Sequence, residues 1–392
     1  MAMPTSSTPQ PPYSFGAPWP ELNEGLSYAD AVPSIHPAPT LIGFYSTEYK
    51  SSAPLEGWLR RIRNGQITID GQVVTDPETV LRAGSKVVYH RLPWKEPPAP
   101  YLLEVLYEDD HMVAINKPSG LQVLPGGIFQ QRTVLQQLRW NTWKGIPVSR
   151  RCGEAHPVPV HRLGRGTSGI LLCAKTKQAK TGLAKLFAVG TSAIEEKRKY
   201  SQKLDKDWRI SKFYRALVTG LLEDDEVIIK QPIGVMQYPG VAKGLYVATS
   251  SGKPALSKVS VVERDVQEKR TLVQVEIHSG RPHQIRIHLA FIGHPLFGDP
   301  LYDIGGHPKS VESELVDGSF AEDGGYNKPT NPVPGDCGYF LHAHRVILFH
   351  PSTDEVVEIT APLPSVLQTN SKELNRKEIP KEGLQCVAGS SS

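Results

Sequence analysis

A polar loop near the middle of the chain carries side-chain types that can do chemistry. From His161 to Gly169, the sequence HRLGRGTSG combines histidine, arginine, threonine and serine with three glycines in a GxGxxG spacing. In dinucleotide-binding proteins such glycines open a helix whose N-terminus faces the pyrophosphate. Here the apolar run ILLCAK follows, which is typical of a buried strand. The sequence of the loop therefore indicates that it displays side chains at a cleft, and argues against a nucleotide-cofactor site. No GxxxxGKS or GxxxxGKT phosphate-binding loop occurs elsewhere in the chain.

This loop and four other stretches resemble the RluA family of pseudouridine synthases. PVHRLGRGTSGILLCAKT is similar to the family's signature, which runs His-Arg-Leu-Asp, two variable residues, Thr-Ser-Gly and a strand ending in Ala-Lys; Gly164 stands where the family has the aspartate. The other stretches occur in the family's order: INKPSGLQVLPG, KFYRALVTG, SGRPHQIRIHLAFIGHPLFGDPLY and LHAHRVILFHPST. The resemblance implies an α+β catalytic domain with helices around a mixed, largely antiparallel sheet.

The resemblance also implies an isomerase that converts uridine in RNA to pseudouridine. Detaching a uracil, turning it and rejoining it through carbon cannot happen inside a stacked helix, so the base must be flipped out. By the family pattern, Tyr214 stacks on the uracil and assists proton transfer, while Arg286 keeps the catalytic aspartate ionised. Position 164 is where that aspartate would stand. The reaction needs neither a metal nor an organic cofactor, so we expect none.

Further polar side chains are predicted to contact RNA. Arg281 and His283 follow the family pattern as residues that shape the pocket. The predicted contacts from the signature loop and the strand after it are Arg162, Arg165, Thr167 and Lys175. Structural roles remain alternatives for two of these residues. Tyr214 could be a strand aromatic that packs in the core, and Arg286 could form a structural ion pair.

Gly164 leaves hypotheses of different classes open. Glycine offers no carboxylate, and loss of a nucleophile lowers the rates of other enzymes by on the order of 10⁴ to 10⁶. The first hypothesis is an RNA pseudouridine synthase whose carboxylate is unassigned, and the second is an RNA-binding protein on the same fold without catalysis. Asp299 is the only acid within the five stretches, and the family uses it in a structural turn. A third hypothesis, a small-molecule nucleotide enzyme, predicts no RNA affinity and no steep salt dependence, whereas the first two predict that log affinity for RNA falls with log salt.

Charge is distributed unevenly along the chain. The net charge is only +4, but residues 137–215 contain 18 Lys or Arg against 5 Asp or Glu, a local excess of +13. The rest of the chain therefore sums to −9. Such clustering indicates a polyanionic partner, and we expect it to be RNA.

A small RNA-binding domain is predicted before the catalytic domain. Residues 1–45 are rich in Pro, Ser and Thr, which predicts a disordered N-terminal tail. In residues 46–92, apolar positions from Leu55 to Ile62 recur at helical spacing, and Asp70-Gly71 is a hairpin signal. The sequence LEGWLRRIRNGQITIDGQVV resembles part of an S4 domain, although a generic α+β lobe stays open. The helix residues predicted to contact RNA are Arg60, Arg61 and Arg63.

The remaining boundaries follow from composition. Residues 93–100 are proline-dense and are predicted to be a linker, and residues 101–365 form the predicted catalytic domain. Within it, residues 303–338 are predicted to be an acidic surface loop, and residues 366–392 a C-terminal tail.

Composition also limits partners and location. No apolar run approaches the ~18 residues that a membrane-spanning helix needs, so we expect no membrane partner. The four cysteines are scattered, which suggests neither a disulfide framework nor a zinc site. We expect a monomer in the cytoplasm or nucleus, with an organellar location left open.

Overall fold

The computed structural model describes residues 13–34, 36–144, 155–197, 210–238, 241–309, 336–353 and 355–369. These residues form two compact units. The larger one, the sheet unit, contains the described parts of Met1–Trp19, Pro97–Val311 and Val333–Ser392, and the small unit contains those of Pro20–Glu96. No helix in these residues is both long and apolar enough to cross a membrane.

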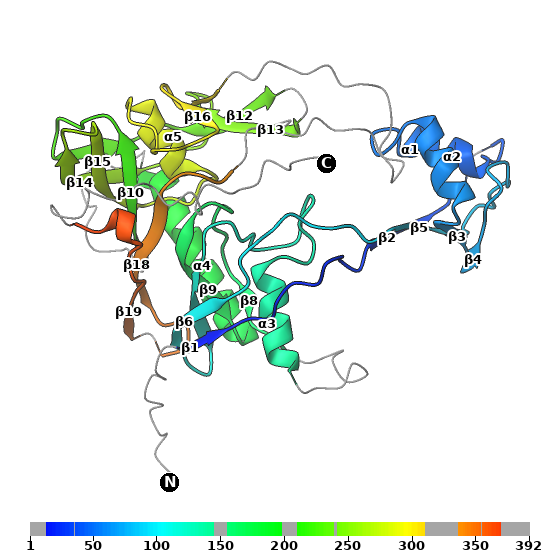
Figure 1. The fold of residues 1–392 in the computed structure, drawn as a ribbon, viewed down its shortest axis with the longest axis horizontal. Coiled ribbons are helices and arrows are strands. Elements are labelled where there is room, and N and C mark those ends of the chain that lie inside the picture. Colours follow the sequence, from blue (N-terminus) through cyan, green and yellow to red (C-terminus); the bar gives the residue numbers. More distant parts are fainter. Residues whose placement is uncertain are drawn as a thin grey trace, which may run out of the picture. The chain divides into compact units, whose positions relative to one another are not determined.

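Within the described residues, the sheet unit is built on an 11-stranded sheet (Figure 1). The strand order is β1-β6-β7-β9-β18-β10-β15-β14-β11, with β8 beside β9 and β19 beside β18. In this part of the chain β9 and β18 are parallel and the other neighbours are antiparallel, so the predicted sheet type is confirmed. The strands are β1 (Tyr13–Phe15), β6 (Leu103–Glu108), β7 (Met112–Lys117), β8 (Val158–Pro159), β9 (Ser168–Ala174), β10 (Ile210–Thr219), β11 (Glu226–Ile229), β14 (Ser257–Asp265), β15 (Arg270–Ile277), β18 (Leu341–Phe349) and β19 (Val356–Thr360).

The strand after the polar loop is buried on both faces. Ile170 and Leu172 of β9 pack on one face with α4 (Lys177–Lys197), whereas Leu171 packs on the other face with α3 (Val134–Trp143). A strand covered on both faces has a continuous apolar sequence, because successive side chains point to opposite sides. This explains why ILLCAK is uniformly apolar, and it fixes where the polar loop enters the sheet.

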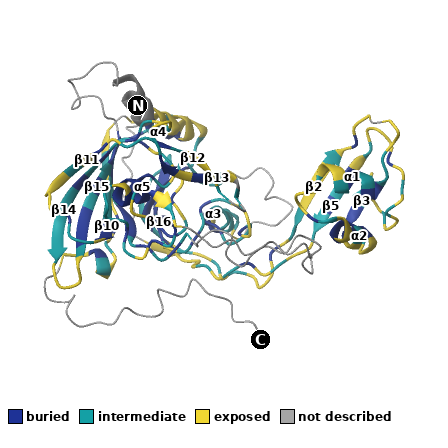
Figure 2. Cartoon of the chain, turned by 90° about the horizontal axis from the view of Figure 1, so that it is seen from above, coloured by how far each residue is buried: buried dark blue, intermediate teal, exposed yellow. Residues whose placement is uncertain are grey.

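Helix α5 (Gln284–Phe291) lies between the sheet and two short ribbons. All its residues from Gln284 to Ala290 are buried, as Figure 2 shows in dark blue. Ile285 packs against the sheet, and Ile287 packs against the ribbons. The ribbons are β12 (Ile233–Tyr238) with β13 (Val241–Ala248), and β16 (Tyr302–Asp303) with β17 (His307–Pro308). Burial on both sides holds the helix that carries Arg286.

The small unit packs two helices on a four-stranded sheet in its described residues. The amphipathic helix predicted from Leu55 is α2 (Leu55–Arg63), and Trp58 and Ile62 lie in its core. Asp70 and Gly71 both have positive φ angles, 49° and 86°, as a tight hairpin turn requires. The other elements are α1 (Leu41–Glu48), β2 (Leu26–Ala31), β3 (Ile67–Ile69), β4 (Gln72–Val73) and β5 (Lys86–Arg91), in the sheet order β2-β5-β3-β4.

Three predicted boundaries need correction. The prediction of a disordered tail over 1–45 is wrong from residue 13 onward, because β1 pairs with β6, β2 pairs with β5, and α1 begins inside that range. The segment 303–338 contains the β16–β17 ribbon, and its residues 310–335 lie outside the described part. The segment 366–392 begins in an ordered turn whose Leu367 is buried, while residues 370–392 lie outside the described part.

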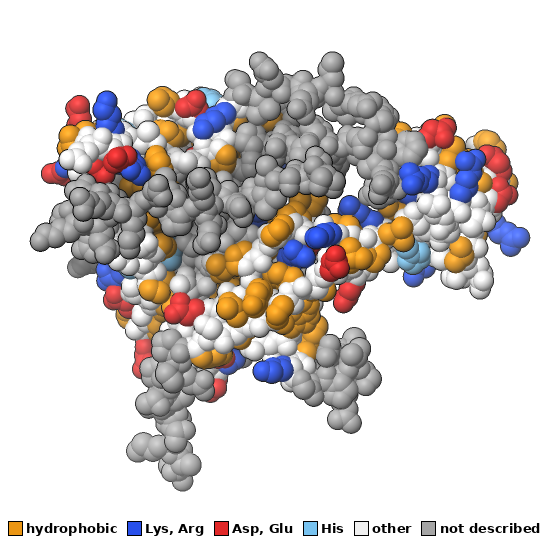
Figure 3. Space-filling view, in the orientation of Figure 1, with side chains coloured by type: hydrophobic (Ala, Val, Ile, Leu, Met, Phe, Trp, Pro, Cys, Tyr) orange, Lys and Arg blue, Asp and Glu red, His pale blue; other side chains and the backbone are white. Residues whose placement is uncertain are grey.

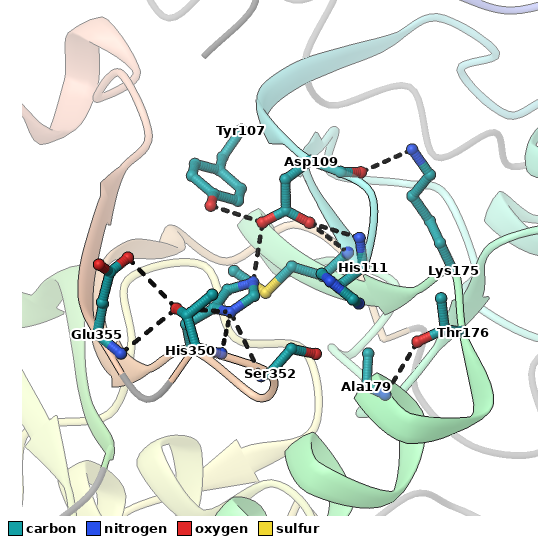
Figure 4. Close-up of polar contacts among 11 residues, drawn as sticks. Tyr107, Asp109, His111, Lys175, Thr176, Ala179, His350, Ser352 and Glu355 are labelled. Atoms are coloured by element: carbon teal, nitrogen blue, oxygen red, sulfur yellow. Dashed lines mark hydrogen bonds and ion pairs between the residues drawn. The ribbon is translucent and has the colours of Figure 1, made fainter. Parts of the chain in front are cut away.

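A polar network fastens the turn between β6 and β7 to the loop after β18 (Figure 4). Asp109 accepts hydrogen bonds from the Tyr107 hydroxyl at 2.7 Å and from two backbone N–H groups of its own turn. His350 donates from Nε2 to Asp109 at 2.9 Å, because its Nδ1 accepts from two backbone N–H groups of its loop. Burial alone would raise the pKa of Asp109, but these hydrogen bonds lower it.

Replacing Asp109 by asparagine should therefore lower the free energy of unfolding by about 2 kcal/mol at neutral pH. A carboxyl whose pKa is lower in the folded protein stabilises above its unfolded pKa of about 3.9 and loses that contribution as pH falls through its folded value. The difference between the two proteins should therefore shrink below about pH 4, as measured by urea denaturation across pH. Asp110→Asn, at the exposed neighbouring position, is the control and should change little. Equal stability of Asp109→Asn and the unaltered chain at neutral pH would contradict this role.

Candidate active site

Buried Lys117 holds the backbone of the polar loop. Its side chain is fully buried at the end of β7, and Nζ donates to the carbonyls of Pro118, Leu121 and Arg165 at 2.8, 2.7 and 3.1 Å. Burial lowers the pKa of this ammonium group to about 7. Lys117 is not among the residues predicted from the sequence, although a lysine at the end of the apolar strand MVAINK is a signal that could have indicated it.

Gly164 faces the hydroxyl of Tyr339. A Cβ at position 164 would lie 2.9 Å from that hydroxyl and 3.4 Å from Thr167 Oγ1. The Tyr339 ring is buried, and its hydroxyl shares a hydrogen bond of 3.1 Å with Thr167. Tyr339 therefore fills space that a side chain at position 164 would need. Tyr339 lies outside the five stretches and is not among the residues predicted from the sequence.

The residues before Tyr339 lie directly against the loop. A Cβ at Gly166 would lie 2.5 Å from the Asp336 carbonyl and 2.9 Å from Cys337 Cα. No side chain fits at that distance from backbone, so this close approach requires glycine at 166. The segment 336–339 and the segment 164–167 are thus packed backbone to backbone.

Arg286 pairs with Asp299 in the interior. Nε and Nη2 of Arg286 donate to the two carboxylate oxygens at 2.8 and 2.7 Å, and the guanidinium lies 4.3 Å from the Tyr339 ring centre and 5.0 Å from that of Tyr302. Burial alone would lower the pKa of Arg286, but the pairing with Asp299 raises it. Within the described residues, Nη1 is buried and has no hydrogen-bond partner. The carboxylate that pairs with Arg286 is therefore that of Asp299, and not that of a residue in the polar loop.

Tyr214 packs between the two halves of the site. It contacts the core cluster that contains Leu163 of the loop and the cluster that contains Tyr339. Burial raises the pKa of its hydroxyl to about 12, so the phenol stays neutral at physiological pH. With His161 and Lys212 it also lines a cavity of about 20 Å³, which has room for about one water molecule.

The other predicted site residues divide by position. Arg281 and His283 flank the start of α5; the first donates to the Pro254 carbonyl at 3.0 Å, and the second contacts the Tyr302 hydroxyl at 2.8 Å. Burial and the charge of Arg286 lower the pKa of His283 to about 4, so its ring is neutral. In the loop, Arg162 is exposed, Thr167 contacts Tyr339, and Arg165 pairs with Asp336 at 2.8 Å.

Two residues predicted to contact RNA have partners within the protein. Lys175 follows the far end of β9, six residues beyond the loop, where it pairs with Glu108 at 2.9 Å. It also donates to the Asp109 carbonyl at 2.7 Å (Figure 4). Arg61 is buried, with its guanidinium 4.6 Å from the Trp58 ring centre and 4.7 Å from that of Tyr89. Stacking between aromatic rings gives Arg61 a structural role. Its neighbours Arg60 and Arg63 are exposed.

The contact between position 164 and Tyr339 yields a stability prediction. Gly164→Asp should lower the free energy of unfolding by about 1–3 kcal/mol, because its Cβ would crowd the Tyr339 hydroxyl. Tyr339→Phe removes that hydroxyl, so the double variant should be more stable than the sum of the single effects predicts. Urea denaturation of the four proteins measures this coupling, and no coupling would contradict the contact. Gly280→Ala is the control, because its Cβ would meet nothing within 4 Å.

Comparison with known proteins places the chain in a family. Residues 111–291 match the family described as RNA pseudouridylate synthase. RNA pseudouridine synthase 5 of rice is 62% identical, over 95% of this chain and 96% of that protein. The Arabidopsis thaliana protein of the same name is 62% identical over 92% and 98%, and an uncharacterised RNA pseudouridine synthase of Synechocystis is 36% identical over 84% and 96%. The chain therefore belongs to the RNA pseudouridylate synthase family.

Proposed function

We propose that this protein isomerises uridine to pseudouridine in a structured RNA after flipping the target base out of its stack. The reaction replaces the bond between ribose C1′ and uracil N1 by a bond between C1′ and C5. Substrate and product have the same atoms, so the isomerisation consumes no second substrate. Membership of the family supports this reaction class.

The buried Nη1 donor of Arg286 carries the proposal. A buried donor without an acceptor costs about 1–3 kcal/mol, and native proteins tolerate such costs mainly at functional sites. Asp299 uses the other two donor groups of this guanidinium, so Nη1 is the one left for a ligand. An acceptor oxygen of the RNA would satisfy it. Tyr214, a neutral phenol, is suited to stack on the uracil and to donate a proton.

We assign RNA binding to both units. Arg60 and Arg63 are exposed on α2, and several Lys and Arg side chains lie on the surface of the small unit (right of Figure 3). In the sheet unit, Arg162 is exposed in the polar loop. The helix and hairpin of the small unit are consistent with an S4-like domain. Such contacts read the shape and backbone of RNA more than its bases.

A second candidate is RNA binding without chemistry. Two observations favour it: Gly164 supplies no carboxylate, and Tyr339 fills the adjoining space. The buried Arg286–Asp299 pair and Tyr214 would then serve stability alone. RNA affinity is common to both candidates, and product formation separates them.

If the exposed arginines of α2 contact phosphates, neutralising them should weaken RNA binding and reduce its salt dependence. The paired variant Arg60→Gln and Arg63→Gln should reduce the slope of log affinity against log salt by about one to two. Binding titrations of a folded RNA at several salt concentrations measure the slope. Lys258→Gln, on β14, is the matched control for loss of exposed positive charge and should leave the slope nearly unchanged. An unchanged slope in the paired variant would remove α2 from the RNA surface.

Pseudouridine formation tests the proposed reaction directly. Purified protein incubated with total cellular RNA should produce pseudouridine, detected by chromatography of the digested nucleosides. Tyr214→Phe should reduce the rate by about 10² or more, because it removes the proton-transferring hydroxyl. Tyr246→Phe, at a partly exposed tyrosine of β13, should keep the rate. RNA binding with no product from the unaltered chain would reject the isomerase and leave the second candidate.

A further inference from the structure

Among the described residues, two carboxylates adjoin the candidate active site, and the first, Asp299, is buried in an ion pair with Arg286. Asp299 is 4% exposed, and both of its oxygens accept from Arg286. Its Oδ1 also accepts from the backbone N–H groups of Leu301 and Tyr302 at 2.8 and 3.1 Å. A carboxylate so occupied cannot approach a ribose without breaking the ion pair that holds α5.

The second carboxylate, Asp336, has an oxygen available. Arg165 donates from Nε and Nη2 to Oδ1, both at 2.8 Å, and the Asp336 side chain is 41% exposed. Oδ2 has no hydrogen-bond partner among the described residues. Asp336 thus combines a fixed orientation with access from solvent, which is the condition a catalytic carboxylate needs.

Asp336 lies beside the polar loop, in which Gly164 stands at the position of the family's catalytic aspartate. Its carbonyl is the nearest atom to the Cβ position of Gly166, and Tyr339 of the same segment faces Gly164. The charge of Asp336 also reaches the pocket residues. It opposes the lowering of the Lys117 and His283 pKa values by burial, and adds to the raising of the Tyr339 pKa by burial. The segment 336–339 therefore supplies both the group that faces position 164 and a carboxylate beside it.

We propose that Asp336 is the catalytic carboxylate of this protein and acts in place of an aspartate at position 164. The inference rests on the proposed isomerase function. It extends the catalytic set by a residue that lies 172 positions from Gly164 in the sequence. Arg165 is then a positioning residue, which orients the carboxylate.

The proposed step is a displacement at the sugar. Asp336 Oδ2 bonds to ribose C1′ as the C1′–N1 bond breaks, and that electron pair leaves with the uracil. After the base turns, C5 bonds to C1′, the C1′–Oδ2 bond breaks, and its electron pair returns to the carboxylate. C5 then loses its proton and N1 gains one. The number of protons and electrons is unchanged.

The test compares Asp336 variants under conditions that separate chemistry from binding. Asp336→Asn should lower the rate of pseudouridine formation by on the order of 10⁴ or more while RNA affinity stays within a few-fold. In Asp336→Ala, added formate should restore part of the rate with saturation, because formate can occupy the vacated carboxylate position. Asp224→Asn, an exposed acid in the loop before β11, is the control and should keep full activity. Thermal denaturation checks that each variant is folded.

Each outcome decides one claim. An active unaltered chain with a folded, inactive Asp336→Asn and formate rescue of Asp336→Ala supports the inference. An active unaltered chain with an active Asp336→Asn, or with no formate rescue, overturns Asp336 and leaves the isomerase intact. No activity in the unaltered chain rejects the proposed function and the inference with it.

Discussion

The buried ion pair between Arg286 and Asp299 is the interaction on which the rest of the site depends. The two side chains are 3% and 1% exposed, and removal of one partner from such a pair costs about 3–5 kcal/mol. The pair joins α5 to the turn before the β16–β17 ribbon, and the guanidinium lies beside the rings of Tyr302 and Tyr339. Tyr339, which contacts the guanidinium, belongs to the segment 336–339 that packs against the polar loop. The ion pair therefore links α5, this segment and the loop.

The packing of Tyr339 and the Arg286–Asp299 pair also determines which carboxylate can act on a substrate. Position 164 has no carboxylate and faces the Tyr339 hydroxyl, and Asp299 is committed to Arg286. The chemistry must then come from a carboxylate outside the family's motifs, or be absent. The chain contains two groups whose burial costs folding free energy: Lys117 under the polar loop, and the Arg286 guanidinium with an unpaired Nη1 donor. Their retention is easier to explain by a reaction than by RNA binding alone.

Local sequence patterns predicted those helices, strands and turns whose sequence signal is contained within a few neighbouring residues. The spacing from Leu55 to Ile62 gave helix α2, Asp70-Gly71 gave the hairpin, and the apolar run after the loop gave β9. Features that depend on distant partners escaped prediction. Strands β1 and β2 have weak patterns of their own and are ordered by pairing with β6 and β5.

The same distinction holds for the site. Family motifs indicated Tyr214 and Arg286, but no local signal gives the pairing of Arg286 with Asp299 on another element. Arg61 looked like an exposed basic residue, because its stacking on Tyr89 depends on a strand that lies 28 residues away in the chain. Asp336 looked like one acid among many in an acidic stretch. Its relation to Arg165 exists only in the folded protein.

The central claim is that this chain catalyses isomerisation without a carboxylate at position 164. Release of tritium from C5 of labelled uridine in RNA tests it most directly, because the C5–H bond breaks only if the base is rejoined through carbon. With the unaltered chain in excess over RNA, we predict release of tritium to water in proportion to the amount of target uridine. Complete binding of the RNA with no release would contradict it.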